Sequence, residues 1–326
     1  MGLNLFISVV GFAMLYFGAE WLVRGSSSMA RAMGISPLVI GLTVVAFGTS
    51  APELVVSLIS SIQGKSMIAV GNVVGSNICN IALVLGLASI FQPITSSKSV
   101  VRRDIPIMLG ISVYLFIISL NSGIGRIEGM SLFGGVILYT IFNYYIASKE
   151  SRANREQGMK EYESELEEIG YVATRSKQIL FILVGIAGVV IGAQAVVDSS
   201  VKIMKLLGVR EKFIGLTIVA FGTSLPELAT SEVAALRKEM DISIGNLVGS
   251  NVFNILSVLG VASMIRPITI PGGFFGSGLF IDYLVMIFTC LLPWFMMRKQ
   301  PTLSRRGGAV LLACYAGYIC YLVVKA

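Results

Sequence analysis

The sequence predicts an all-α polytopic membrane protein, with ten transmembrane helices in two inverted five-helix repeats and broken helices at the centre. Three observations lead to this prediction. The 326 residues are 55% hydrophobic and only 13% charged, which is far more apolar than a soluble globular chain. Apolar runs long enough to cross a bilayer recur from end to end. One long segment is also present twice.

The duplicated segment is 41–94, which aligns without a gap to 215–268 with more than half of the paired positions identical. Both copies carry Gly-Thr-Ser-x-Pro-Glu-Leu and, further along, Gly-Asn-x-Val-Gly-Ser-Asn. The identities therefore include polar residues inside apolar segments. Self-similarity of this kind is typical of transporters built from internal repeats.

Length and hydropathy divide the chain into a first repeat over 1–147, a charged linker over 148–177 and a second repeat over 178–326. Each repeat contains five predicted spans. Because five is odd, the second repeat enters the membrane in the opposite orientation to the first. In chain order the ten spans are 3–23, 35–61, 66–91, 104–121, 128–147, 178–201, 212–236, 241–265, 279–297 and 307–324.

The first span follows no basic leader and no small-residue cleavage site, so we expect it to be permanent. The linker is rich in Glu but lacks the order of an EF-hand loop, which favours a solvated connector over a calcium sensor. Four other acids are expected near membrane faces, outside any site. Two have a cation four residues later, and two lie toward span ends: Glu20, Asp198, Glu232 and Asp282.

The charge pattern predicts a multi-pass membrane protein with both termini outside and the linker in the cytoplasm. Most of the 25 Lys and Arg residues fall on the linker side of this arrangement. A net charge of +7 would suggest a nucleic-acid partner for a soluble chain, but here the cations lie at span ends. We expect the lipid bilayer as surroundings, no nucleic acid and no obligate protein partner.

The first motif predicts a helix that breaks near mid-membrane and restarts, because proline and glycine interrupt it. Ser50 and Ser224 each precede a Glu by three residues, which is the pattern of a capping box at the restart. The break is expected to expose backbone carbonyls around Ala46 and Ala220. Carbonyl, hydroxyl and carboxylate oxygens together suit Na⁺ and Ca²⁺.

Glu53 and Glu227 are the strongest candidates for function, because an ionised carboxylate at the bilayer centre costs several kcal/mol unless it is paired or hydrated. A proline kink with a capped restart would explain one such motif, but not a carboxylate at both repeat positions. The chain contains no histidine, and its four cysteines show no ligand spacing, which argues against zinc or copper.

The second motif places a hydroxyl and an amide four residues apart on one helix face, as Ser76 with Asn80 and Ser250 with Asn254. They can complete a coordination shell, or they can be hydrogen-bonding contacts between helices. Gly71 and Gly75 predict close approach of another helix. For the remaining amides both interpretations stay open: Asn72, Asn77, Asn246 and Asn251.

On these motifs the chain resembles the calcium/cation antiporter superfamily, specifically the prokaryotic sodium/calcium exchangers, over essentially its whole length. The resemblance implies mid-membrane cation sites in which both Glu bind Ca²⁺ and the Ser positions serve Na⁺. The implied ligands are Glu53, Glu227, Thr49, Thr223, Ser50, Ser224, Ser76, Ser250, Asn80, Asn254, Ala46 and Ala220. No cofactor is implied, since Na⁺ and Ca²⁺ are the transported ions.

The resemblance implies an antiporter, not an enzyme, that exchanges Na⁺ for Ca²⁺ by alternating access, with the first and sixth spans as a sliding pair. Some potassium-dependent relatives carry Asp where this chain has Asn254, so potassium dependence is not expected. The nearest alternative is a Ca²⁺/H⁺ antiporter that uses the same Glu pair. A channel is less consistent with one buried centre, and the lack of histidine excludes a Ser–His hydrolase. A scaffold protein would need no duplicated buried carboxylates.

Overall fold

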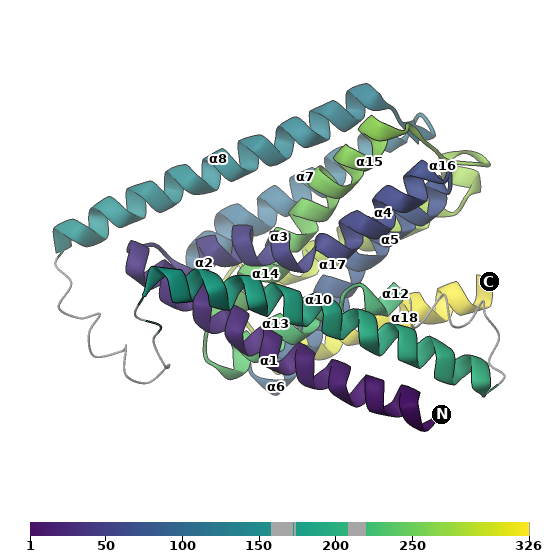
Figure 1. Ribbon diagram of the computed structural model, residues 1–326. Helices are drawn as coiled ribbons and strands as arrows, with labels where there is room; N and C mark the ends of the chain where they lie inside the picture. The colour runs from purple at the N-terminus through teal and green to yellow at the C-terminus, as the bar shows by residue number, and fades with distance from the viewer. Residues whose placement is uncertain (158–171, 173, 208–219, 326) are drawn as a thin grey trace.

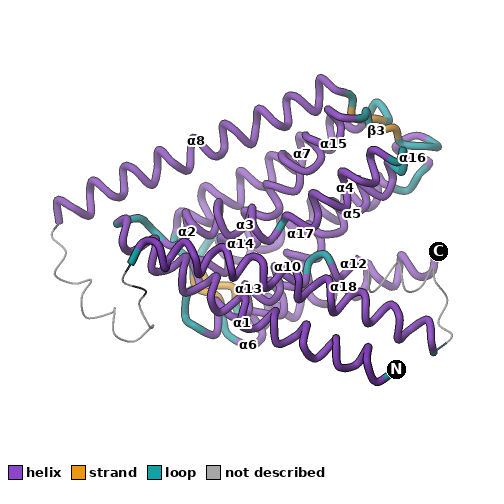
Figure 2. Tube along the Cα trace, in the orientation of Figure 1, coloured by secondary structure: helices purple, strands orange, loops and turns teal. Residues whose placement is uncertain are grey.

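The computed structural model describes residues 1–157, 172, 174–207 and 220–325. The protein is mostly helical (Figures 1 and 2). Within the described residues, seven helices are long and apolar enough to cross a membrane, or eight when a bent pair is counted as one span. The prediction of an all-helical membrane protein is confirmed. The count of ten spans stays a prediction, because the span at 212–236 lies partly outside the described residues.

The first half runs from a long helix through a broken span to a second long helix at the linker. Its elements are α1 (Gly2–Met33), α2 (Pro37–Ile40), the π-helix η1 (Gly41–Val45), α3 (Ala46–Thr49), α4 (Ala51–Ile62), α5 (Ser66–Ile78), η2 (Cys79–Leu85), α6 (Gly86–Phe91), β1 (Ile94–Thr95), η3 (Val100–Asp104), α7 (Ile105–Ser119), β2 (Gly123–Ile124) and α8 (Arg126–Gln157).

The second half repeats this order where it is described. Its elements are α10 (Arg175–Leu206), α12 (Ala220–Gly222), α13 (Leu225–Leu236), α14 (Met240–Phe253), η5 (Asn254–Leu259), α15 (Gly260–Ile265), β3 (Ile268–Thr269), α16 (Gly273–Gly276), α17 (Leu279–Met297), β4 (Thr302–Leu303) and α18 (Arg305–Lys325). The Glu-rich stretch of the linker lies outside the described residues.

Two antiparallel helices, α1 and α10, lie side by side on one face of the molecule (Figure 1). Glycines permit their close approach. A Cβ at Gly18 would lie 2.7 Å from the Val189 nitrogen, and one at Gly185 would lie 2.5 Å from the Leu22 nitrogen. This pair packs against α13 in one apolar cluster, and a second, larger apolar cluster includes residues of α5, α7, α14 and α17.

The chain termini and the linker lie at opposite ends of the molecule. The N- and C-termini lie at one end, which we call the termini end, and α8 finishes and α10 begins at the other, the linker end (Figure 1). Two small sheets join the halves, because Ile94 of β1 pairs with Leu303 of β4, and Ile124 of β2 pairs with Ile268 of β3. Figure 2 shows β3 at the end of the molecule where α16 lies.

In both duplicated segments the helices are interrupted at or next to the two motifs. In the first, α3 and α4 are bent by 45° across Ser50, and Pro52 lies in the first turn of α4. In both, the second motif ends in a π-helix, since η2 begins at Cys79 and η5 at Asn254. Such π-segments are frequent at functional sites.

Candidate cation site

The two duplicated glutamates lie in the first turns of α4 and α13, where each broken helix restarts. Both side chains are fully buried, and the Ser50 hydroxyl of the first half donates to Glu227 of the second half. Every sequence-predicted site residue with a described side chain, except Thr223, is at most 3% exposed. The structure therefore brings residues from both halves to one buried centre.

The capping box predicted at both restarts is wrong. Ser50 and Ser224 occupy the N-cap positions, yet neither side chain makes a capping hydrogen bond. The hydroxyl of Ser50 instead donates to Glu227 Oε1 of the other half at 3.4 Å. A buried carboxylate is a stronger acceptor than any other group nearby, and it takes the hydroxyl away from its own helix.

Hydroxyls from both halves surround the two carboxylates. Ser76 donates to Glu53 Oε1 at 3.3 Å, and its hydroxyl lies 3.4 Å from that of Thr223. Thr49 donates to Asn246 Oδ1 at 3.0 Å, and its Oγ1 lies 3.2 Å from Ser250 Oγ. Each half thus supplies side chains to the surroundings of the other half's glutamate.

The side-chain amides of Asn80 and Asn254 use their nitrogens in hydrogen bonds but leave their oxygens without a donor. Asn80 donates its Nδ2 to Asn251 Oδ1, and Asn254 donates its Nδ2 to Asn77 Oδ1, each at 3.1 Å. The Asn77 and Asn251 amides are themselves fixed, because each donates to the other's backbone carbonyl, at 3.1 and 3.2 Å. Asn80 Oδ1 and Asn254 Oδ1 are left buried without a partner.

These two oxygens belong to a larger unpartnered set. The second oxygen of each glutamate and the hydroxyl of Ser224 are also buried without any hydrogen-bond partner. Buried polar groups without partners are rare and costly in proteins. A set of five that carries two carboxylates and offers only oxygen is the donor chemistry that Ca²⁺ and Na⁺ select. Among the described residues there is no cluster of three or more His, Cys, Asp or Glu that could hold a metal ion.

Sequence reasoning left Asn72 and Asn246 open, and the structure gives both a supporting position. Asn72 Nδ2 donates to the Glu53 carbonyl at 3.2 Å and to Ser57 Oγ at 2.9 Å. Asn246 Nδ2 makes the equivalent bonds to the Glu227 carbonyl at 3.4 Å and to Ser231 Oγ at 3.0 Å. The serines were missed, although their identity in both repeats was a usable signal.

The backbone positions are described unequally in the two halves. The Ala46 carbonyl accepts hydrogen bonds from the Ser50 N–H at 3.0 Å and from the Thr49 hydroxyl at 3.3 Å. Ala220 begins α12, and the residues before it lie outside the described part of the chain. The close approach of another helix that was predicted at Gly71 and Gly75 is not seen among the described residues, because an added Cβ at either position would meet nothing within 4 Å. A close approach is seen instead at their repeat equivalents. A Cβ at Gly245 or Gly249 would lie 2.9 or 2.7 Å from a backbone oxygen of Leu38 or Leu42.

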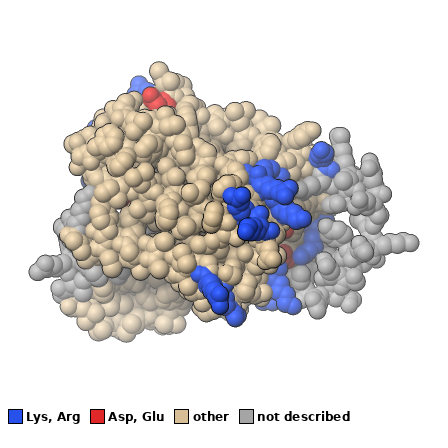
Figure 3. Space-filling model, turned by 180° about the vertical axis from the view of Figure 1, so that it is seen from behind, with Lys and Arg blue, Asp and Glu red and all other residues tan. Residues whose placement is uncertain are grey.

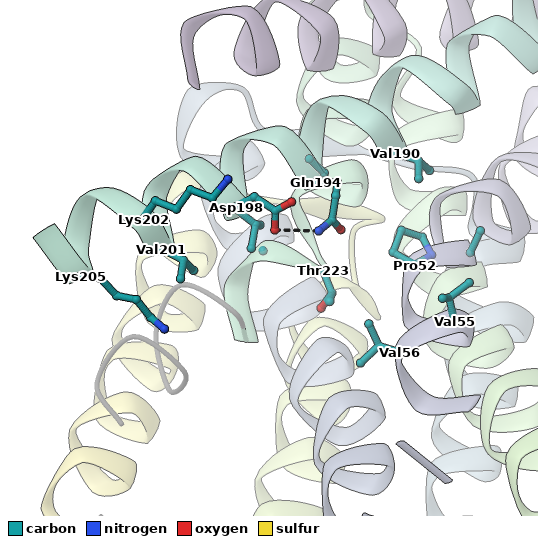
Figure 4. A pocket seen from close by; sticks show the side chains of 14 residues that line it. Pro52, Val55, Val56, Val190, Gln194, Asp198, Val201, Lys202, Lys205 and Thr223 are labelled. Atoms are coloured by element: carbon teal, nitrogen blue, oxygen red, sulfur yellow. Dashed lines mark hydrogen bonds between the residues drawn. The ribbon is translucent and has the colours of Figure 1, made fainter. Parts of the chain in front are cut away.

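A cavity of about 800 Å³ lies beside the site, and its lining extends along α10 as far as Lys205 (Figure 4). It lies between α10 and the restart of α4, and Thr223 forms part of its wall. Valines and Pro52 line much of it, while Gln194 donates to Asp198 at 2.9 Å on the α10 side. We call this cavity the vestibule.

Three of the four acids that were expected outside the site make contacts with residues outside the predicted set. Glu20 pairs with Arg24 at 2.8 Å, as its spacing predicted, and it also pairs with Arg237 of α13. Asp282 accepts from Tyr318 at 3.1 Å. Asp198 accepts from Gln194, whereas the sequence predicted a pair with Lys202.

Comparisons with known proteins agree with this geometry. A family model described as sodium/calcium exchanger protein matches residues 3–147 and 177–324. Among curated proteins, the putative antiporter CaxA of Alkalimonas amylolytica is 35% identical over 312 residues, covering 95% of each chain. The sodium/calcium exchanger MaX1 of Methanosarcina acetivorans is 31% identical over 347 residues, covering 98% of each.

A solved structure gives the same answer for the fold. The sodium-calcium exchanger NCX_Mj superposes with a TM-score of 0.79 at 32% sequence identity, and the match covers 98% of both chains. The crystal of that protein was soaked with Na⁺ and Ca²⁺.

Proposed function

The chain belongs to the sodium/calcium exchanger family, and from this premise we propose that it exchanges Na⁺ for Ca²⁺ across a prokaryotic cell membrane. Family membership makes it a membrane transporter and not an enzyme. The observation that carries the proposal is the buried oxygen set around Glu53 and Glu227, which come from different repeats and lack donors for their second oxygens. The division into two repeats, 1–147 and 178–326, around the linker 148–177 is part of the proposal.

In the proposed site one Ca²⁺ is neutralised by the two glutamates. Hydroxyl and amide oxygens would complete the Ca²⁺ shell and the neighbouring Na⁺ shells, together with Thr49, Thr223 and the backbone carbonyls of Ala46 and Ala220. These hydroxyls and amides belong to Ser50, Ser76, Ser224, Ser250, Asn80 and Asn254. Since both kinds of ion need the same carboxylates, they compete. Binding of one load therefore excludes the other, which is the requirement for exchange.

Access to the site supports alternating access. The vestibule extends along α10 as far as Lys205, near the end of α10 that lies at the termini end (Figure 1), while α1 contacts α13 and is joined by an ion pair to Arg237, just after α13. We propose that α1 and α10 slide together over the core to open the opposite passage. The basic side chains that gather toward the linker end in Figure 3 support a cytoplasmic linker and outer termini.

The charge balance sets the response to voltage. A Na⁺ load larger than two ions leaves positive charge on the two-carboxylate site, and moving one charge across the membrane is worth roughly 2.3 kcal/mol per 100 mV. Exchange with such a load responds to membrane potential. An equal-charge exchange does not.

The test is ⁴⁵Ca²⁺ uptake into proteoliposomes loaded with Na⁺, compared with K⁺-loaded vesicles and with vesicles that carry only a pH gradient. We expect uptake only with internal Na⁺. Uptake that follows the pH gradient and ignores Na⁺ would establish the Ca²⁺/H⁺ alternative at the same site. Uptake without countertransport of any ion would contradict an antiporter.

The site is tested in the same assay by Glu53→Gln and Glu227→Gln, each of which removes one charge while keeping its shape. Both are expected to abolish uptake, because the remaining carboxylate cannot neutralise a divalent ion. Glu232→Gln, on the same helix as Glu227 but outside the site, is the matched control and should transport normally. Uptake that survives in both site variants would move the site elsewhere.

A further inference from the structure

Charged side chains connect α1 to the end of α13 in two places on the linker side of the site. Glu20 forms an ion pair with Arg24 at 2.8 Å and accepts a hydrogen bond from the Nε of Arg237 at 2.9 Å. Arg31 donates to Glu239 at 2.7 Å, and the Ser27 hydroxyl donates to the same carboxylate oxygen. We call these six residues the α1–α13 latch: Glu20, Arg24, Ser27, Arg31, Arg237 and Glu239.

The two carboxylates of the latch are buried, whereas the side chains of Arg24 and Arg237 are 34% and 38% exposed. Glu20 is 6% exposed and Glu239 is 5% exposed, and the side chain of Arg31 is 15% exposed. Removing one partner of a buried ion pair is strongly destabilising, because the other charge stays uncompensated. Separating α1 from α13 must therefore break these pairs or transfer them to water.

The repeat relationship shows what the latch occupies. The vestibule wall on α10 includes Gln194, Asp198, Val201 and Lys205. Their equivalents 174 positions earlier are four members of the latch: Glu20, Arg24, Ser27 and Arg31. The same positions that border open space at the termini end are thus bonded to the core at the linker end.

At the termini end the equivalent positions cannot form the two ion pairs that join α1 to the residues after α13. The equivalents of Arg237 and Glu239 are Gln63 and Lys65. The Arg31–Glu239 pair corresponds to Lys205 and Lys65, two positive charges that cannot pair with each other. The ion pairs therefore favour a closed linker end over a closed termini end.

A second observation concerns Thr230 on α13. Val56 borders the vestibule, whereas its equivalent Thr230 is fully buried and its hydroxyl has no partner. A buried hydroxyl without a partner is costly, and this one lies one turn from Glu227 toward the end of α13. Thr230 thus occupies the position that would line a passage if the linker end opened as the termini end has.

We propose that the α1–α13 latch is the gate of the linker-end passage, and that its ion pairs set the balance between the two access states. The proposal rests on the alternating access proposed above. It assigns these residues a positioning role, since they do not contact the ion site. A weakened latch should increase the population of the state that is open at the linker end.

The test measures thiol reactivity, which does not require transport. In a background with the four native cysteines replaced by alanine, Thr230→Cys and Val56→Cys report the two passages through their N-ethylmaleimide labelling rates in detergent. We expect Glu239→Gln combined with Glu20→Gln to raise labelling at position 230 about tenfold and to lower labelling at position 56. Tenfold is the change produced by a shift of about 1.4 kcal/mol in the equilibrium between two states.

Two further variants keep the outcome interpretable. Lys238→Gln removes an exposed charge between Arg237 and Glu239 and should leave both rates within about twofold of the parent. The double variant Arg31→Glu with Glu239→Arg swaps the two charges and keeps the ion pair, so its labelling rates at positions 56 and 230 should equal those of the parent. Unchanged rates in the double Gln variant would overturn the latch, and so would a rise at both positions, which indicates general loosening. Failure of the Na⁺-driven uptake test, with labelling as expected, would overturn the transport proposal alone.

Discussion

Asn77 and Asn251 act on the candidate site through their neighbours and not through contact with the ion. Each is held by the other's backbone and offers its amide oxygen to Asn254 or Asn80. This fixes which atom of Asn80 and Asn254 points away from the neighbouring amide. The orientation of two candidate ligands thus depends on a pair of amides that cross between the halves.

The first residue-scale prediction concerns this pair. Asn77→Ala and Asn251→Ala should each lower Ca²⁺ affinity by about 10- to 100-fold, the effect expected when an outer partner of a ligand is lost. Equilibrium ⁴⁵Ca²⁺ binding measures it. Asn121→Ala, a loop substitution at an exposed position, is the control. Affinity within twofold of the parent in both site variants would mean that Asn80 and Asn254 are oriented by something else.

At this scale the sequence located the carboxylates but not their partners. Glu53 and Glu227 were predictable because a duplicated charge inside an apolar span has few structural explanations. The bond from Ser50 to Glu227 was not, because a local capping pattern says nothing of a carboxylate 177 residues away that competes for the hydroxyl. The roles of Asn77 and Asn251 likewise depend on contacts between the halves.

Helices α1 and α10 are in contact along glycine faces, and this sets how they can move. The approach at Gly18 and Gly185 leaves no room for a methyl group without a shift of the partner backbone. Because the two helices are so closely packed, we expect them to move as one body over the core.

The element-scale prediction follows from this packing. Gly18→Ala and Gly185→Ala should each destabilise the protein by about 1–3 kcal/mol, the usual cost of overpacking, and lower its thermal unfolding temperature in detergent. Gly134→Ala on α8 and Gly110→Ala on α7 have nothing within 4 Å of the added carbon and should be neutral or slightly stabilising. Equal melting temperatures for the two sets would contradict a rigid α1–α10 pair.

Helix lengths show where sequence reasoning stops at this scale. The apolar pattern predicted a first span of 3–23, whereas α1 continues to Met33. The extra turns carry Arg24, which pairs with Glu20 as its spacing predicted, and Arg31, whose partner Glu239 is brought to it only by the fold. The hydrophobic pattern predicts the apolar part of a helix. It does not predict the turns that are stabilised by ion pairs with other parts of the fold.

The molecule as a whole is asymmetric despite its duplicated sequence. One end has a vestibule lined by α10 and α4, and the other has α1 bonded to α13. Inversion of the repeats could be predicted from the odd number of spans. The closure of the linker end could not be predicted from the sequence, because it depends on a few positions at which the two copies differ, such as Lys65 and Glu239.

Sidedness gives the whole-molecule prediction. In intact right-side-out vesicles with a cysteine-free background, Gly2→Cys should react with a membrane-impermeant thiol reagent, and Lys149→Cys should react only after permeabilisation. Both positions are exposed, so reactivity reports the side of the membrane. The reversed pattern would place the linker outside and would exchange the inner and outer assignments of the two passages.

The central claim is that one cation site is built from both halves of the chain, with Glu53 and Glu227 sharing the ion. Equilibrium ⁴⁵Ca²⁺ binding to the purified protein, titrated with Na⁺, tests it most directly. We expect about one Ca²⁺ per chain, as two carboxylates neutralise one divalent ion, displacement by Na⁺ but not by K⁺, and loss of binding in Glu53→Gln and in Glu227→Gln alike. Two binding sites per chain, of which each Gln variant removes only one, or binding that Na⁺ leaves untouched, would contradict a shared site.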